Sequence, residues 1–119
     1  MKVLVIEDDA TVRNFIVTIL RETDHTVLEA ENGMDSLKIL KEQRNTDLII
    51  TDIIMPDKEG IETIIEVRKK YPELKIIAIS GGGKLDPDQY LLLAATLGAN
   101  KTLKKPFKGS ELLDTIADL

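Results

Sequence analysis

The stretch VLVIEDD, residues 3–9, joins four consecutive apolar side chains to three acids. Apolar, β-branched runs recur at intervals of roughly 20 to 30 residues; they lie at 26–29, 48–51, 76–79 and, more weakly, 101–104. The runs at 3–6, 48–51 and 76–79 are continuously apolar, as expected of central parallel strands that helices cover on both faces. The sequence therefore predicts five strands, with the second and fifth at the edges of a sheet.

The segment after the first run carries apolar residues at helical spacing. Its stripe consists of Val12, Phe15, Ile16, Ile19 and Leu20, at offsets 0, 3, 4, 7 and 8. Asp8 or Asp9 is expected to begin this helix, because a short carboxylate can accept hydrogen bonds from the amides of a first turn. Similar patterns predict helices at 34–40 and 61–68, the latter closed by Tyr71-Pro72.

Two more helices are expected in the last third of the chain. Asp86-Pro87 is typical of a cap followed by a first helical residue, and Gly98 is typical of a helix stop. The leucines at 91–93 are interpreted as core, since a helix normally buries such residues. Ser110 is predicted to cap the fifth helix.

A β-α unit repeated five times indicates an α/β fold. Each pair of parallel strands needs a crossover, so the pattern predicts a doubly wound sandwich: a parallel five-stranded sheet with helices on both faces. The chain has 119 residues, of which 43% are hydrophobic, enough for one compact core. Residues 1–119 are therefore expected to form a single domain.

Composition excludes several classes of function. With 21 acidic and 16 basic side chains, the formal net charge of −5 opposes binding to nucleic acid. No cysteine is present, which excludes disulfides and thiolate metal sites and fits a cytoplasmic location. No stretch approaches the ~18 apolar residues of a membrane span, so neither secretion nor membrane insertion is expected.

Polar residues close the predicted strands. Glu7, Asp8 and Asp9 follow the first run, Asp52 the third and Ser80 the fourth, and Lys105-Pro106 follows the fifth. In open α/β sheets, ligands bind beyond the carboxyl ends of the strands. Carboxylates, a hydroxyl and an ammonium are therefore expected to meet at one edge.

These groups suit phosphoryl chemistry on a magnesium site. Unit charges about 4 Å apart repel by about 4 kcal/mol at an effective dielectric near 20, so the converging acids need a counter-charge. Oxygen ligands without His or Cys favour a hard ion, and Mg²⁺ suits a site with few carboxylates and several waters. A carboxylate beside a metal and Lys105 is a plausible nucleophile toward phosphorus, and the central acid is Asp52.

With these residues in view, the chain resembles the receiver (CheY-like) domain of bacterial two-component response regulators. The resemblance covers essentially the whole length and rests on VLVIEDD at 3–9, TDIIMPDKEG at 51–60, AIS at 78–80, GAN at 98–100 and KKPF at 104–107. It implies a flavodoxin-like (βα)5 fold with strand order 2-1-3-4-5.

The resemblance also implies roles for the acids. Asp52 would accept a phosphoryl group from a sensor histidine kinase, a phosphotransfer protein or a small phosphodonor. Asp8 would ligate Mg²⁺ directly, Glu7 mostly through water, and Ile54 through its backbone carbonyl. With Ile54 and Gly82 at positions that tune the family, loss of phosphate is expected to be slow.

Further roles are implied for residues of the fourth and fifth strands. Lys105, joined to Pro106 by a cis peptide bond, would pair with a phosphoryl oxygen. Ser80 would donate to the phosphoryl group and shift toward it. The family's usual aromatic switch residue falls at Thr102, a small hydroxyl residue, so the aromatic form of the readout cannot operate.

The leading hypothesis is therefore a phosphorylation-dependent signalling switch. The protein is not expected to be an enzyme, apart from slow self-catalysed phosphoryl transfer and autodephosphorylation. The alternatives are a degenerate receiver that only binds partners, and an aspartate-nucleophile phosphatase, which usually needs an acid where this chain has Ile54. A flavin carrier is a weaker alternative, because Glu7-Asp8-Asp9 would repel its phosphate.

Signals would pass to a protein partner or to an effector domain outside this segment. The fourth helix, fifth strand and fifth helix would form the contact face, which could also support a homodimer.

Overall fold

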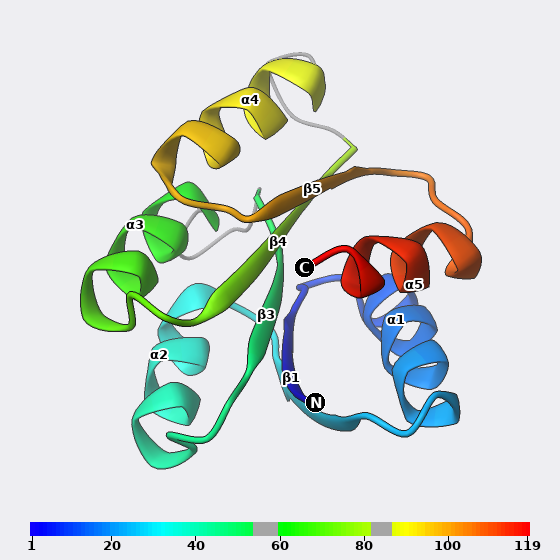
Figure 1. Cartoon of the computed structure of the whole chain (residues 1–119), viewed down its shortest axis with the longest axis horizontal. Coiled ribbons are helices and arrows are strands. Elements are labelled where there is room, and N and C mark those ends of the chain that lie inside the picture. Colours follow the sequence, from blue (N-terminus) through cyan, green and yellow to red (C-terminus); the bar gives the residue numbers. More distant parts are fainter. Residues whose placement is uncertain (54–59, 82–86) are drawn as a thin grey trace.

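The computed structural model of the chain describes residues 1–53, 60–81 and 87–119. Strands and helices alternate along the sequence, as predicted (Figure 1). The strands are β1 (Lys2–Ile6), β2 (Thr26–Ala30), β3 (Leu48–Asp52), β4 (Lys75–Ser80) and β5 (Lys101–Lys104). The helices are α1 (Ala10–Glu22), α2 (Gly33–Glu42), α3 (Gly60–Lys70), α4 (Pro87–Leu97) and α5 (Gly109–Ala117).

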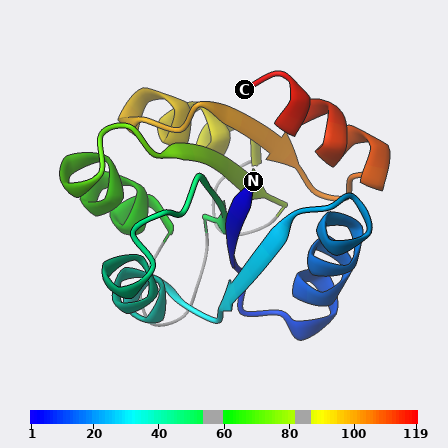
Figure 2. The ribbon, with the colours of Figure 1, turned by 60° about the horizontal axis from the view of Figure 1, so that its bottom comes forward.

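The strands form one parallel sheet in the order β2-β1-β3-β4-β5. Helices α1 and α5 cover one face, and α2, α3 and α4 cover the other (Figures 1 and 2). The predicted doubly wound α/β fold, its strand order and its two edge strands are therefore confirmed. Because all five strands run the same way, their carboxyl ends lie at one edge of the sheet.

Two apolar layers sandwich the sheet because successive side chains of a strand point to opposite faces. In β1, Val3 and Val5 pack toward α1 and α5, whereas Leu4 and Ile6 pack toward the other three helices. All four side chains are fully buried. Two-sided burial is the physical reason for the uninterrupted apolar runs in the sequence.

The helix starts confirm one prediction and correct another. The Asp9 carboxylate caps α1, accepting hydrogen bonds from the amides of Thr11 at 2.8 Å and Val12 at 3.2 Å. The Ser110 prediction is wrong, because α5 begins at Gly109 and its cap position is Lys108. There the Glu111 carboxylate reaches back to the Lys108 amide at 3.0 Å, so the acid in the first turn holds the helix start.

The assignment of residues 91–93 to the core is wrong for the two leucines whose side chains the structure describes. Leu92 is 70% exposed and Leu93 41% exposed, and α4 turns Ala94 to the core instead. The helix covers only β4 and the edge strand β5, so a narrow face suffices to bury the sheet there. Gly98 ends α4 as predicted, with a φ of 127° that favours glycine. The Asp86 cap lies outside the described residues.

One member of the α1 stripe also departs from prediction. Ile16 and Leu20 are buried, but Phe15 is 45% exposed. Its ring lies 6.0 Å from that of Phe107, on the segment between β5 and α5. Phe15 therefore packs at the rim of the sheet and not within the core.

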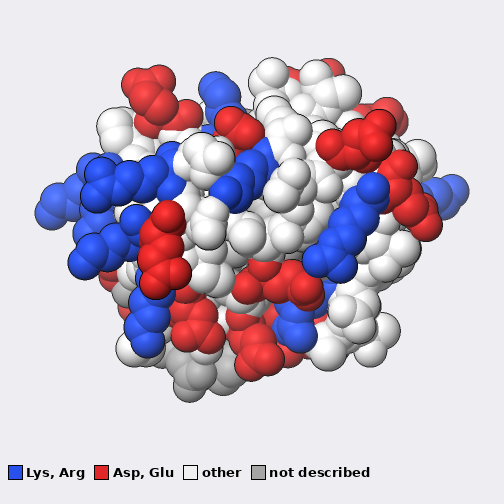
Figure 3. Space-filling model, turned by 90° about the horizontal axis from the view of Figure 1, so that it is seen from below, with Lys and Arg blue, Asp and Glu red and all other residues white. Residues whose placement is uncertain are grey.

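Charged side chains of both signs lie next to one another on the surface seen in Figure 3. None of the helices in the described part of the chain is long and apolar enough to span a bilayer.

Candidate functional site

A lysine and two buried acids form the centre of the carboxyl edge. The Lys105 ammonium lies 2.9 Å from Asp52 Oδ2 and 3.0 Å from Glu7 Oε1. Asp52 ends β3 and Glu7 follows β1, and these two strands are neighbours in the sheet. Glu7 is 2% exposed and Asp52 8% exposed, so one cation compensates two carboxylates that are largely removed from water.

A third carboxylate completes the acidic group. Glu7, Asp8 and Asp52 each offer an oxygen, and these oxygens lie within 4.8 Å of one another. Asp8 is exposed at the mouth of the group, while the other two lie beneath it. An all-oxygen set with one ligand open to solvent fits Mg²⁺, which keeps several of its waters. The residues present therefore fit the ion that the sequence predicts.

The electrostatics of the site show how tightly its charges are coupled. Burial, together with hydrogen bonding and repulsion from Asp52, raises the pKa of Glu7 from its ordinary 4.5 to about 8. Burial alone would lower the pKa of Lys105, but its hydrogen bonds and attraction to Asp52 and Glu7 prevail and raise it. Lys105 therefore stays charged, and the acids carry more negative charge than one ammonium balances once Glu7 is ionised.

Ser80 lies beside this group at the end of β4. It is fully buried, and its hydroxyl has no hydrogen-bond partner among the residues that the structure describes. Asp52 pairs with Ile79 across the sheet, which places Ser80 one residue beyond the acid. A buried hydroxyl without a partner is costly in a folded protein, so it is a candidate donor to a ligand.

The lack of a side chain at Gly81 leaves room for the Lys105 side chain beside the acids. A Cβ atom built on Gly81 would lie 2.4 Å from Cβ of Lys105, closer than real contacts allow. The backbone of the two segments is also tied, since the Lys105 amide donates to the Ser80 carbonyl at 2.8 Å. The sequence identifies Gly81 only as part of a glycine-rich loop, because nothing along the chain signals its contact with a residue 24 positions away.

Some of the remaining predicted residues lie in the described part of the chain and others do not. Thr102 lies in the edge strand β5, half-buried and paired with Ala78 of β4. The peptide bond between Lys105 and Pro106 is cis, as the resemblance implies. Ile54 and Gly82 lie outside the described residues.

Arg13 was also missed by our sequence analysis. Its Nη1 donates to the Glu7 carbonyl at 2.8 Å, from the second turn of α1. The pattern of an amphipathic helix predicts that a polar residue such as Arg13 faces solvent. A contact with a backbone carbonyl leaves no signal in the sequence that would correct this prediction.

The comparisons with known proteins agree with this geometry. A family model described as the response regulator receiver domain matches residues 3–117. The chain is 34% identical over 123 residues to a chemotaxis protein CheY homolog of Campylobacter jejuni, covering 100% of this chain and 92% of that protein. It is 32% identical over 118 residues to the sensor kinase CckA of Brucella abortus, covering 98% of this chain and 12% of the kinase. A solved receiver domain protein from Clostridium thermocellum superposes with a TM-score of 0.89 at 31% identity, covering 98% of this chain and 91% of that one.

Proposed function

The chain belongs to the response regulator receiver domain family, and on that basis we propose that it is a phosphorylation-dependent switch in which Asp52 is the phosphoacceptor. Residues 1–119 form one receiver domain in this proposal. The observation that carries it is the pair of contacts from one ammonium, Lys105, to Asp52 at 2.9 Å and to Glu7 at 3.0 Å. In the proposed reaction this cation would neutralise the negative charge that develops on the transferred phosphoryl group.

The chemistry is a group transfer to a carboxylate. An oxygen of Asp52 forms a bond to phosphorus, and the bond from phosphorus to the donor breaks, so the electron pair of that bond leaves with the donor. With phosphohistidine the leaving group is the imidazole nitrogen, which is protonated from solvent; with acetyl phosphate it is acetate. The product on the chain is an aspartyl phosphate.

The other residues bind and orient the group. Bound Mg²⁺ would neutralise phosphoryl oxygens. Asp8 and Asp52 would hold it directly, Glu7 mostly through water, and Ile54 by its backbone carbonyl. Lys105 would pair with one phosphoryl oxygen, and the buried hydroxyl of Ser80 would donate a hydrogen bond to another.

The output in this proposal is a change of conformation, and the chain turns over no substrate apart from slow autodephosphorylation. The donor would be a sensor histidine kinase or a phosphotransfer protein in the cytoplasm. The shift of Ser80 would be read through Thr102 without an aromatic ring. The face made by α4, β5 and α5 would contact a protein partner, an effector domain or a second copy of the chain.

A phosphorylation assay tests the acceptor. The chain is incubated with acetyl phosphate and Mg²⁺, and intact mass is measured for the unaltered chain, for Asp52→Asn and for Asp114→Asn. Asp114 is an exposed acid of α5 and serves as the control. We expect one phosphoryl group on the unaltered chain and on Asp114→Asn, and none on Asp52→Asn. A chain that never gains the group would support the partner-binding alternative, and a group retained by Asp52→Asn would reject the acceptor.

The lifetime of the phosphorylated chain tests the tuning positions. Ile54 and Gly82 have no side-chain group that orients a water for attack on the phosphate, so we expect slow loss of phosphate after the donor is removed. Complete loss within seconds at neutral pH would contradict this part of the proposal.

A further inference from the structure

Arg13, near the start of α1, contacts the backbone of one of the acids in the group. Its Nη1 donates to the Glu7 carbonyl at 2.8 Å, and its Nε lies 3.3 Å from Glu29 Oε1. The Arg13 side chain is only 14% exposed. We propose that Arg13 is a positioning residue that fixes the Glu7-Asp8 turn for Mg²⁺ binding, an inference that rests on the proposed function.

The Glu7 peptide groups are held from two sides. The Glu7 amide donates to the Ala30 carbonyl of β2 at 3.0 Å, and the Glu7 carbonyl accepts from Arg13. The regular strand β1 ends at Ile6, so these two bonds continue the order of the sheet beyond the strand. They set the plane of the peptide that joins Glu7 to Asp8, and thereby the direction in which both carboxylates leave the backbone.

Glu29 in turn orients the arginine. It lies on the edge strand β2 and accepts from Arg13 Nε, while Arg21 approaches its other oxygen at 3.7 Å. A planar guanidinium held by a carboxylate through one nitrogen presents its remaining donors in a fixed direction. Partners that orient metal ligands in this way typically change metal affinity by about 10- to 100-fold when removed.

The charge of Arg13 and its proposed positioning role predict opposite changes in Mg²⁺ affinity when the residue is replaced. By charge alone, removal of a cation near the acidic group would strengthen binding of Mg²⁺. If Arg13 fixes the ligands, its removal must weaken that binding, because Glu7 and Asp8 would have to be ordered at the moment the ion binds. The sign of the change therefore separates the two roles.

We expect Arg13→Gln to fold, because the side chain that it removes borders open space. Arg13 borders a surface cavity of about 570 Å³ between α1, β2 and α2, lined also by Glu29, Asp35 and Lys38. Water from this cavity can reach the Glu7 carbonyl once the guanidinium is gone, so no buried acceptor is left without a partner.

The experiment measures Mg²⁺ binding directly, without a phosphodonor. The full chain is labelled with ¹⁵N, and amide shifts are followed during titration with MgCl₂ for the unaltered chain, Arg13→Gln, Arg13→Lys and Arg21→Gln. Arg21 is the matched control, because it contacts the same Glu29 but not Glu7. The dissociation constant should rise about tenfold in Arg13→Gln, and less in Arg13→Lys, which keeps the charge and one donor group. Arg21→Gln should change it by less than about twofold.

Unchanged or tighter binding in Arg13→Gln would overturn the positioning role, and so would an equal loss in Arg21→Gln. The amide spectrum reports folding in the same samples, and Arg13→Lys decides the question if Arg13→Gln does not fold. Failure of this inference leaves Asp52 phosphorylation intact in the acetyl phosphate assay. Failure of the proposed function would instead show as an unaltered chain that gains no phosphoryl group, whatever the Mg²⁺ titration of Arg13→Gln gives.

Discussion

The amino ends and the carboxyl ends of the five strands, called the amino edge and the carboxyl edge of the sheet, differ in how their charged groups are paired. At the amino edge, one cation is spread over neutral acceptors: Arg68 of α3 donates to the Gly98 carbonyl at 2.7 Å and to the Leu74 carbonyl at 2.7 Å. It also reaches the Asn100 side-chain oxygen at 2.9 Å, which accepts from the Ile76 amide as well. Each of these polar groups has its partner within the fold.

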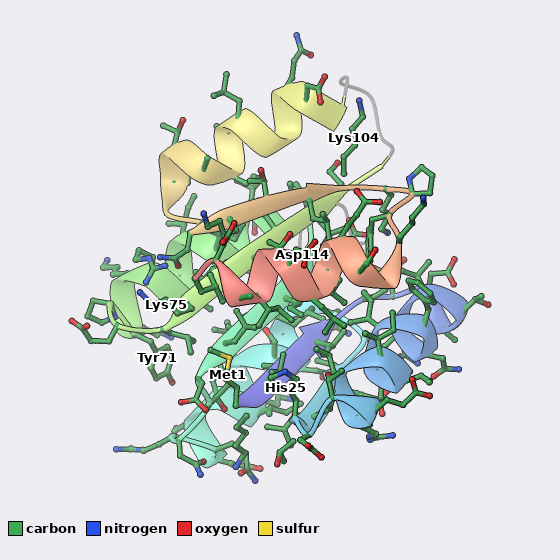
Figure 4. The ribbon with its side chains drawn as sticks, turned by 45° about the vertical axis from the view of Figure 1, so that its right-hand side comes forward. Met1, His25, Tyr71, Lys75, Lys104 and Asp114 are labelled. Atoms are coloured by element: carbon green, nitrogen blue, oxygen red, sulfur yellow. The ribbon has the colours of Figure 1, made fainter. Side chains whose placement is uncertain are left out.

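At the carboxyl edge the situation is reversed. One ammonium, Lys105, faces two buried carboxylates and an exposed third, and the hydroxyl of Ser80 has no partner among the described residues. Figure 4 labels one lysine from each edge, Lys75 at the start of β4 and Lys104 at the end of β5. The polar groups around Arg68 are therefore paired within the fold, whereas the groups of the carboxyl edge fit the cation and the hydrogen-bond acceptor that the proposed function would supply.

The largest expected effect is on the chemistry of the carboxyl edge. Lys105→Met removes the cation that would neutralise a phosphoryl oxygen, and it should slow phosphorylation by acetyl phosphate about a hundredfold. Rates are measured by intact mass against time. The control is Lys104→Met, because Lys104 is exposed and pairs only with exposed Asp88 at 3.4 Å among the described contacts. If the phosphorylation rate of Lys105→Met lies within about threefold of the rate of the unaltered chain, Lys105 does not have the proposed role.

The next effect is on the pH dependence of stability without Mg²⁺. An unfolded chain releases the Glu7 proton near 4.5, whereas the folded chain keeps it up to about 8. Between these values the folded state holds one more proton, so the free energy of unfolding falls as pH rises. Glu7→Gln should remove this loss, which is on the order of 4 kcal/mol between about pH 5 and about pH 8.5.

Urea unfolding at about pH 5 and about pH 8.5, in EDTA, measures this difference. Glu73→Gln is the control, since Glu73 is an exposed acid near the amino edge. Equal pH dependence in Glu7→Gln and in the unaltered chain would show that the pKa of Glu7 is not raised in the folded state.

A third substitution tests the amino edge. Arg68→Gln removes donors from the carbonyls of Gly98, Pro72 and Leu74, and it should lower the free energy of unfolding by about 2 kcal/mol. The phosphorylation rate of the folded variant should stay unchanged. Lys69→Gln, in the same last turn of α3, serves as the exposed control. Slower phosphorylation with unchanged stability would contradict the division between the two edges.

The smallest expected effect compares two fully buried serines. Ser80 has no hydroxyl partner among the described residues, whereas Ser36 donates to the Gly33 carbonyl at 2.6 Å. Ser80→Ala should raise the free energy of unfolding by about 1 kcal/mol, and Ser36→Ala should lower it by about 1 kcal/mol. Thermal and urea unfolding without Mg²⁺ measure both. Changes of the same sign would mean that Ser80 is paired in the folded chain.

Much of this molecule could be predicted because local patterns and global topology agree. Continuous apolar runs identified the strands that are buried on both faces, and the residues that close them identified Glu7, Asp52 and Ser80. Asp8 or Asp9 was expected to begin α1 from residue type alone, and Asp9 is the residue that caps it. These inferences succeed because parallel strands must deliver their carboxyl ends to one edge.

The failures share a different cause. Leu92 and Leu93 are apolar residues of a helix, yet they are exposed because α4 covers only the edge of the sheet. Ser110 is a good cap by residue type, but the cap of α5 is Lys108, two residues earlier, where the Lys108 amide donates to the Glu111 carboxylate. In both cases residue type gives only the preference of a position, and the contacts made in the folded chain decide the outcome.

The order of strands and helices, and the set of side chains at the carboxyl edge, follow from the sequence by itself, because periodicity and strand ends are properties of the chain. Only the tertiary structure decided that Lys105 contacts both Glu7 and Asp52, that burial raises the pKa of Glu7, and that Arg13 donates to the Glu7 carbonyl. Those features depend on distances between segments that are remote in sequence, and such distances exist only after the sheet has assembled.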